Sequence, residues 1–94
     1  MNVVWTLPGV AALADIHAHI SASNPAAADA LRDRALSYVE MKLAAHPMIR
    51  RPGRVDGTRE SVIHPSYIIV YRVTTDRIEI LTVRHVARTW PAEF

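Results

Sequence analysis

Two strand-like runs joined by a very short connection place the strongest constraint on how this chain can fold. The first run, Tyr67–Val73, is rich in β-branched and aromatic residues and is too short for a stable helix. The second run, Arg77–His85, alternates between apolar and polar residues along much of its length. Because only Thr74–Asp76 separates them, the two runs must pair as an antiparallel hairpin. The alternation predicts two opposite sides of the second strand, with Ile78, Ile80 and Thr82 on one side and Glu79, Leu81 and Val83 on the other.

The residues before the hairpin predict a loop followed by one more strand. Arg50–Gly57 contains one proline and two glycines, which are typical of a loop. Thr58–Ile63 ends in β-branched and apolar residues and is predicted to be a strand, which ends at the proline within His64–Ser66. Tyr67–Val73 is apolar on both faces except at Arg72, as expected of a central strand that is covered on both sides.

Two helices are predicted in the first half of the chain, after a short apolar run at Val3–Trp5 that is expected to form a first or edge strand. Apolar residues at helical spacing indicate a helix over Pro8–Ile20, and a polar connector follows it. Asn24 is the predicted N-cap of a second helix, with Pro25 at its first position. This second helix is predicted to end near Ala45, just before a histidine–proline pair.

These elements predict a single α+β domain over residues 1–94, with the order β-αα-βββ. An N-terminal strand is followed by an antiparallel helical hairpin and then by a three-stranded antiparallel sheet region. The helices can cover only one face of the sheet. We therefore expect the other face of the central strand to meet another surface.

Composition places the chain among small folded proteins and shows where its charge lies. Its 94 residues are enough for one domain, and half of them are hydrophobic, which excludes a disordered tail. There is no cysteine, no basic leader and no apolar run near 18 residues, so we expect a soluble cytoplasmic protein. The formal net charge is +2, but residues 50–94 hold eight arginines against five acidic residues. Arginine presents a planar fork that suits phosphate or carboxylate groups.

The histidines do not predict a metal site, and we expect neither a metal nor a cofactor. His17 and His19 lie two residues apart on a predicted helix, so their side chains point in different directions and cannot share a metal ion. His46 and His64 each precede a proline and are expected in turns. His85 ends the last predicted strand, where it either packs against the sheet or serves in acid–base chemistry.

A series of segments in the second half of the chain resembles a known family. The order is GRVDGTRE, then YIIVYRV, then a short turn, then RIEILTVRHVARTWP, and it is similar to toxins of the RelE/ParE superfamily. The resemblance implies a two-layer RelE/ParE-like fold and the toxin half of a bacterial type II toxin–antitoxin pair. It also implies neutralisation by a cognate antitoxin in a hetero-oligomer, with growth inhibition and plasmid stabilisation as the biological outcome.

The resemblance leaves two targets open. RelE-like members cleave messenger RNA on the ribosome, whereas ParE-like members poison DNA gyrase and need no nuclease centre. The candidate catalytic residues that it implies are Arg59, Arg84, His85 and Arg88. The chain departs from the nuclease pattern at three positions: Ser61 replaces a basic residue, Ile68 replaces an arginine, and Phe94 stands nearest to an expected tyrosine. These departures favour a ParE-like toxin, with an endoribonuclease and an inactive antitoxin-binding relative as the alternatives.

Further residues are candidates for binding the target or the antitoxin. Arg54 lies in a glycine-containing loop that either forms a backbone nest for phosphate or is simply a tight turn. Arg72 adds positive charge, and Trp90 either stacks on a base or closes the edge of the core. The apolar faces of the two predicted helices, together with the sheet edge, are expected to bind the antitoxin. The candidate contacts there are Leu13, Ile16, Leu31 and Tyr38.

Overall fold

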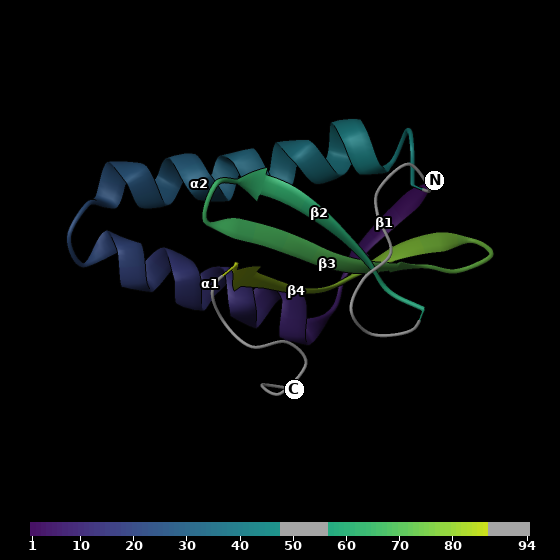
Figure 1. Cartoon of the computed structure of the whole chain (residues 1–94), viewed down its shortest axis with the longest axis horizontal. Helices are drawn as coiled ribbons and strands as arrows, with labels where there is room; N and C mark the ends of the chain where they lie inside the picture. Colours follow the sequence, from purple (N-terminus) through teal and green to yellow (C-terminus); the bar gives the residue numbers. More distant parts are fainter. Residues whose placement is uncertain (48–56, 87–94) are drawn as a thin grey trace.

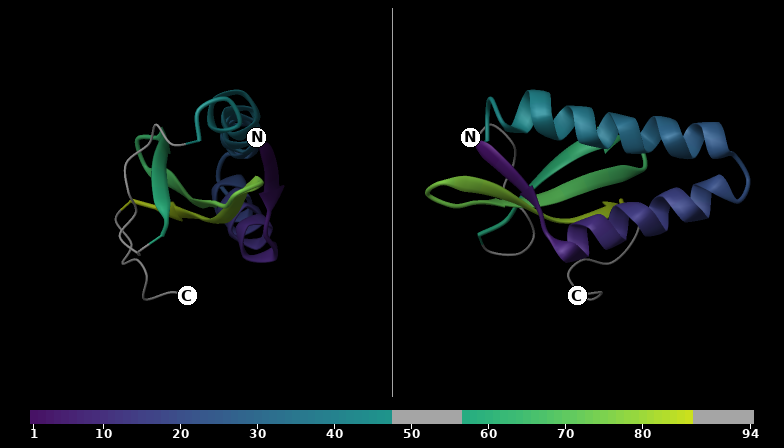
Figure 2. Two further views of the ribbon diagram at one scale, coloured as in Figure 1. Left: turned by 90° about the vertical axis from the view of Figure 1, so that its right-hand side faces the viewer. Right: turned by 180° about the vertical axis from the view of Figure 1, so that it is seen from behind.

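The structure, a computed structural model, describes residues 1–47 and 57–86 and has the predicted two-layer α+β architecture (Figure 1). A helical hairpin lies on one face of a four-stranded sheet, as the two further views in Figure 2 also show. No helix in the described part of the chain is long and apolar enough to cross a membrane. The elements are β1 (Asn2–Trp5), α1 (Leu7–Ser21), α2 (Pro25–Tyr38), the π-helix η1 (Val39–Leu43), β2 (Arg59–His64), β3 (Tyr67–Val73) and β4 (Arg77–His85).

The sheet has the strand order β1-β4-β3-β2, so the predicted hairpin lies at its centre. Strands β3 and β4 pair antiparallel, as expected, and β2 pairs antiparallel with β3. Strand β1 lies at the edge beside β4 and runs parallel to it, with Asn2 opposite Arg77. A parallel pair needs a long connection between its strands, and here the helical hairpin forms part of that connection.

A register shift within the β3–β4 hairpin changes which residues of β4 face the helices. Tyr71 lies opposite Ile80, but Val70 lies opposite Thr82, so Leu81 is an extra residue in β4. This bulge reverses the alternation beyond that point. The core on the helix side therefore contains Ile78, Ile80 and Val83, and the prediction that Thr82 would share that side with the two isoleucines is wrong.

Helix α1 begins with contacts that fasten it to β4. Thr6 is the N-cap, and its hydroxyl oxygen accepts a hydrogen bond from the backbone N–H of Gly9 at 3.2 Å. The same hydroxyl donates to the carbonyl oxygen of Ile80 at 2.6 Å. A Cβ atom at Gly9 would lie only 2.6 Å from that carbonyl oxygen, so this close approach requires glycine.

Helix α2 starts as predicted but does not remain an α-helix to Ala45. Asn24 is its N-cap and accepts a hydrogen bond from the N–H of Ala27 at 3.1 Å. After Tyr38 the helix widens into η1, in which the N–H of Ala44 reaches back to the carbonyl of Val39 at 3.1 Å. Val39 and Leu43 of η1 both face the core, where they are almost fully buried.

The sheet carries apolar residues on both faces, as the sequence of β3 predicted. On the helix side, Ile69 and Tyr71 are completely buried among residues of α1, α2 and the sheet. On the face away from the helices, which we call the distal face, Ile68 and Val70 form a second small cluster with Leu81 packed against it. Both clustered residues are already buried in the chain by itself, 2% and 0% exposed. The expectation that these positions await a separate surface is therefore wrong.

Candidate functional site

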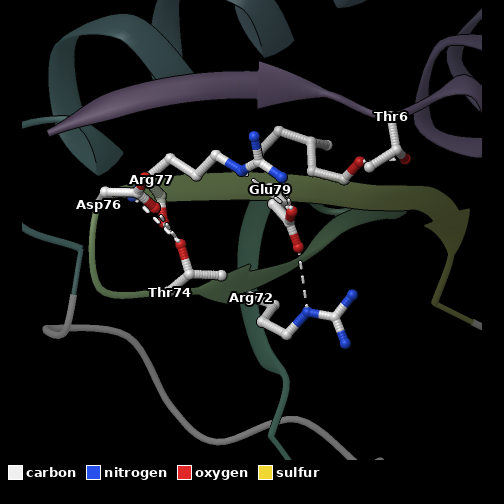
Figure 3. A network of polar contacts seen from close by, with 7 residues as sticks. Thr6, Arg72, Thr74, Asp76, Arg77 and Glu79 are labelled. Atoms are coloured by element: carbon white, nitrogen blue, oxygen red, sulfur yellow. Dashed lines mark hydrogen bonds and ion pairs between the residues drawn. The ribbon is translucent and has the colours of Figure 1, made fainter.

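Two arginines on the distal face share one carboxylate at the turn end of the hairpin (Figure 3). Arg72 on β3 donates from Nε to Oε1 of Glu79 at 3.2 Å. Arg77 on β4 donates from Nε and Nη2 to Oε2 at 3.1 and 2.8 Å. The terminal nitrogens of Arg72 point away from Glu79, and both arginine side chains are about half exposed. The cluster thus presents a net positive charge with guanidinium donors directed to the outside.

The charges of this cluster predict how stability depends on pH. Arg77, followed by Arg72, holds the pKa of the Glu79 carboxyl below its ordinary value of 4.5. A lowered pKa in the folded state contributes stability that is complete above the unfolded pKa and is lost as pH falls through the folded pKa. In acid, the melting-temperature difference between the wild type and Glu79→Gln is therefore expected to shrink as pH falls from 5 to about 2. The control is Asp15→Asn, at an exposed position on α1, and a pH-independent Glu79→Gln difference would contradict the assignment.

Arg84 occupies a different environment from the two hairpin arginines. Its backbone lies opposite Ile68 on the distal face, and the residue is only 5% exposed. Glu60 is similarly buried on the same face, opposite Val70. Charged residues are seldom buried this deeply unless they have partners within the protein. The structure therefore places Arg84 inside the fold, where it supports the sheet.

Three rings meet at the other end of the sheet, where β2 and β4 end and β3 begins. Tyr67 lies opposite His85, and their ring centroids are 5.3 Å apart in an edge-to-face arrangement. The His64 ring lies 5.7 Å from Tyr67 on the β2 side, and its Nδ1 accepts a hydrogen bond from the N–H of Ser66 at 3.0 Å. The sequence singled out His85 but not Tyr67 or His64 as its neighbours. The pairing register of the hairpin is the signal that could have identified Tyr67 as the neighbour of His85. A regular register predicts the wrong neighbour, because the bulge changes which residue of β4 lies opposite Tyr67.

The described catalytic candidates do not converge on one position. Arg59 lies opposite Tyr71, whereas His85 lies opposite Tyr67, four residues away along β3. At roughly 3.3 Å per residue, their backbone positions are about 13 Å apart along the strand. Arg84 neighbours His85 in sequence but faces the opposite side of the sheet, where it is buried. The predicted site residues Arg54, Arg88 and Trp90 lie outside the described residues, as does Phe94, which stands nearest to the expected tyrosine.

An apolar groove lies between the two helices. It has a volume of about 510 Å³, and its lining combines apolar side chains with one histidine and one arginine. Two of the large apolar residues that line it, Val10 and Leu36, are exposed. Exposed apolar surface of this kind marks an interaction site. The groove is lined by Trp5, Val10, Leu13, Ala14, His17, Arg32 and Leu36.

The polar end of the groove contains a small charged cluster. The Nε2 atom of His17 lies 2.8 Å from Oδ1 of Asp29, and Arg32 lies beside both residues. The His17 hydrogen bond, followed by the charge of Arg32, holds the pKa of the Asp29 carboxyl below its usual range. Asp29 therefore stays ionised near neutral pH and acts as the acceptor of this cluster. No group of three or more metal-binding side chains occurs among residues 1–47 and 57–86.

The predicted antitoxin contacts lie mostly in or against the hydrophobic core. Leu13 and Leu31 are buried in the core, and Ile16 and Tyr38 pack against it. Tyr38 also forms a hydrogen bond with Ser61 on β2. Of the four predicted residues, Leu13 is the one that also lines the groove. The apolar periodicity identified the core face of each helix, while the groove is lined mainly by the neighbouring face.

Comparisons with known proteins identify relatives over almost the whole chain. A family model described as the ParE toxin of a type II toxin-antitoxin system, parDE, matches residues 3–90. A protein named "Putative toxin Y4kP" from Sinorhizobium fredii is 42% identical over 91 residues, covering 96% of this chain and 93% of the relative. Toxin RelE2 from Caulobacter vibrioides is 33% identical over 91 residues, covering 93% of this chain and 97% of the relative.

Solved structures show the same fold. A chain from the chromosomal ParDE toxin–antitoxin system of P. aeruginosa has a TM-score of 0.79 and 25% identity, covering 92% of this chain and 96% of that one. A chain from the RelBE2 toxin–antitoxin complex of Mycobacterium tuberculosis has a TM-score of 0.65 and 19% identity, covering 89% and 95%. These comparisons confirm the predicted resemblance and the predicted fold class.

Proposed function

Because this chain belongs to the ParE toxin family of type II toxin–antitoxin systems, we propose that it acts on DNA gyrase and does not cleave messenger RNA. The observation that carries the proposal is the separation of Arg59 from His85 along β3. RNA cleavage through the 2′-hydroxyl needs a proton acceptor, a proton donor and cations around one phosphate. Side chains anchored about 13 Å apart along the strand, on the two strands that flank β3, do not converge on one phosphate.

The proposed contact with gyrase lies on the distal face at the turn end of the hairpin. Arg72 and Arg77 are exposed there and are positioned by Glu79. Positive charge on one face steers a protein toward a DNA-bound partner and raises the rate of association. Arg54, Arg88 and Trp90 remain proposed contacts from the sequence, and Arg84 supports this face from inside.

The proposed partner is a cognate antitoxin that binds the α1–α2 groove and forms a hetero-oligomer with the toxin. The exposed apolar residues around this groove support the proposal, because covering them with a partner removes apolar surface from water. Neutralisation in the cytoplasm, growth inhibition when the antitoxin is missing, and plasmid stabilisation would follow from this pairing.

Two purified systems test the target directly. The protein is expected to inhibit supercoiling by gyrase on plasmid DNA and to leave a defined message intact on translating ribosomes. His85→Ala is expected to keep the gyrase effect, because its ring packs against Tyr67 at the opposite end of the hairpin from the arginines proposed to contact gyrase. Ribosome-dependent cleavage that His85→Ala reduces by about 10²–10⁴, with gyrase unaffected, would overturn the proposal.

The second candidate function is a RelE-like endoribonuclease. The observation that favours it is the Tyr67–His85 ring contact, which brings a phenol and an imidazole together at the end of the sheet. Both groups can transfer protons. An inactive antitoxin-binding relative is the third possibility, and induction of the chain alone separates it from the other two. We expect growth arrest, with DNA breaks before any loss of translation.

A further inference from the structure

We propose that Arg32 selects an acidic residue in the segment that occupies the α1–α2 groove, so that the occupant is an amphipathic peptide with apolar side chains and one carboxylate. This inference rests on the proposed function, because it takes the occupant to be a segment of the antitoxin. Beyond the proposed function, it states that the antitoxin segment carries a carboxylate and that Arg32 of the toxin binds it.

The greater part of the groove accepts apolar side chains. Trp5 from β1, Val10 and Ala14 from α1, and Leu36 from α2 line it. Val10 and Leu36 are 52% and 40% exposed, so a partner that covers them removes apolar surface from water. Polar or charged segments would lose hydration there without gaining hydrogen bonds.

Arg32 is the one charged side chain that lines the groove among the described residues, and it is weakly held. Its ion-pair distances are 3.5 Å to Asp29 and 3.6 Å to Asp33, both longer than a good hydrogen bond. Its Nη1 lies 3.4 Å from Nε2 of His17. The tautomer with its proton on Nε2 donates to Asp29, and this nitrogen then cannot also accept a hydrogen bond from Arg32.

The guanidinium therefore keeps donors for a carboxylate that enters the groove. Asp29 stays engaged with His17 at 2.8 Å and does not line the groove, and Asp33 is also absent from the lining. A carboxylate from the partner can accept two parallel hydrogen bonds from one guanidinium, in the geometry that makes arginine selective for such groups. An approaching lysine or arginine would meet a like charge instead.

The spacing of the groove residues fixes where the carboxylate stands in the partner. Val10 and His17 lie two turns apart on α1, which corresponds to about 10 Å. The His17 ring marks the position of the Arg32 guanidinium, because the two side chains lie side by side. The partner therefore needs its carboxylate about seven residues from the apolar side chain that contacts Val10 if it is helical. In an extended segment the separation is about three residues.

Charge variants of Arg32 test the proposal in the complex with the protein encoded by the adjacent gene. Arg32→Glu is expected to weaken binding by about 100-fold, Arg32→Gln by about tenfold, and Arg32→Lys by less. Arg34→Glu is the matched control, because Arg34 lies on the same helix at an exposed position outside the groove. Melting curves of each free variant show that the fold is intact.

A second arm tests whether the groove itself is occupied. Ala14→Trp fills the groove and is expected to block binding, whereas Ala30→Trp, at an exposed position of α2, is not. In a Trp90→Phe background Trp5 is the only tryptophan, and its fluorescence is expected to shift to shorter wavelength on binding. An unchanged Trp5 signal in a complex that still forms would overturn the assignment of the groove.

A charge swap identifies the partner's residue. Each Asp and Glu of the partner is changed to arginine and tested against Arg32→Glu, and one of these changes is expected to restore binding. Equal losses for Arg32→Glu and Arg34→Glu, or no restoring change, would overturn the role of Arg32 while leaving the antitoxin intact. A wild-type chain that does not bind the adjacent gene product would overturn the proposed partner as well.

Discussion

Replacing Ile69 by aspartate is expected to unfold the domain. Ile69 is completely buried between the sheet and the helices, in the central strand β3. An unpaired carboxylate in such a place costs several kcal/mol, or takes up a proton at a similar cost. Small domains are stable by only about 5–15 kcal/mol, so this one change removes much or all of the margin. Loss of the cooperative thermal transition, followed by circular dichroism, is the expected result.

The matched control is Val62→Asp on the edge strand β2. Val62 is 55% exposed, so its carboxylate stays in water and the melting temperature is expected to change little. A soluble Ile69→Asp protein with an unchanged melting curve would show that β3 does not lie at the centre of the core.

Replacing Arg84 by alanine is expected to lower the free energy of unfolding by about 2–5 kcal/mol, the range for truncation of a large buried side chain. The residue is 5% exposed and lies beside Ile68 in the covered part of the distal face. The change leaves a cavity and alters the polar surroundings of a buried region. Chemical denaturation measures the loss as a lower midpoint.

Arg72→Ala is the comparison for Arg84→Ala, because Arg72 is about half exposed at the end of the hairpin. It is expected to keep the stability of the domain and to reduce gyrase inhibition. A stable Arg84→Ala protein would contradict the structural role. If the expected instability is found, loss of toxicity on changing Arg84 reports unfolding and says nothing about contact with the target.

The elements of the fold could be predicted because their signals are local. Tyr67–Val73 and Arg77–His85 have the bounds expected, and the N-cap at Asn24 starts α2. The short connection left only one pairing for β3 and β4. The parallel pairing of β1 with β4 has no local signature, because it depends on how the helices return the chain to the sheet.

The candidate site was harder to predict because it depends on a single extra residue. Without the bulge at Leu81, Tyr67 would lie opposite Arg84 and the side chains beyond Ile80 would change faces. With it, His85 contacts Tyr67 edge-to-face and Arg84 lies on the covered distal face. The α1–α2 groove was missed for another reason. Helical periodicity identifies residues that face a core, whereas the groove is lined mainly by those beside them.

The parallel pairing of β1 with β4 also determines when a newly synthesised chain can complete its sheet. Asn2 cannot pair until Arg77 has been synthesised, and at about 5–20 residues per second this takes several seconds of translation. The lining of the α1–α2 groove comes entirely from residues 5–36, whereas the hairpin arginines follow much later. The groove residues are thus synthesised first, but Trp5 belongs to β1 and lies opposite Ile80, so the groove is complete only when β4 has joined the sheet. Both proposed surfaces therefore depend on β4, and neither is available before this last strand is made.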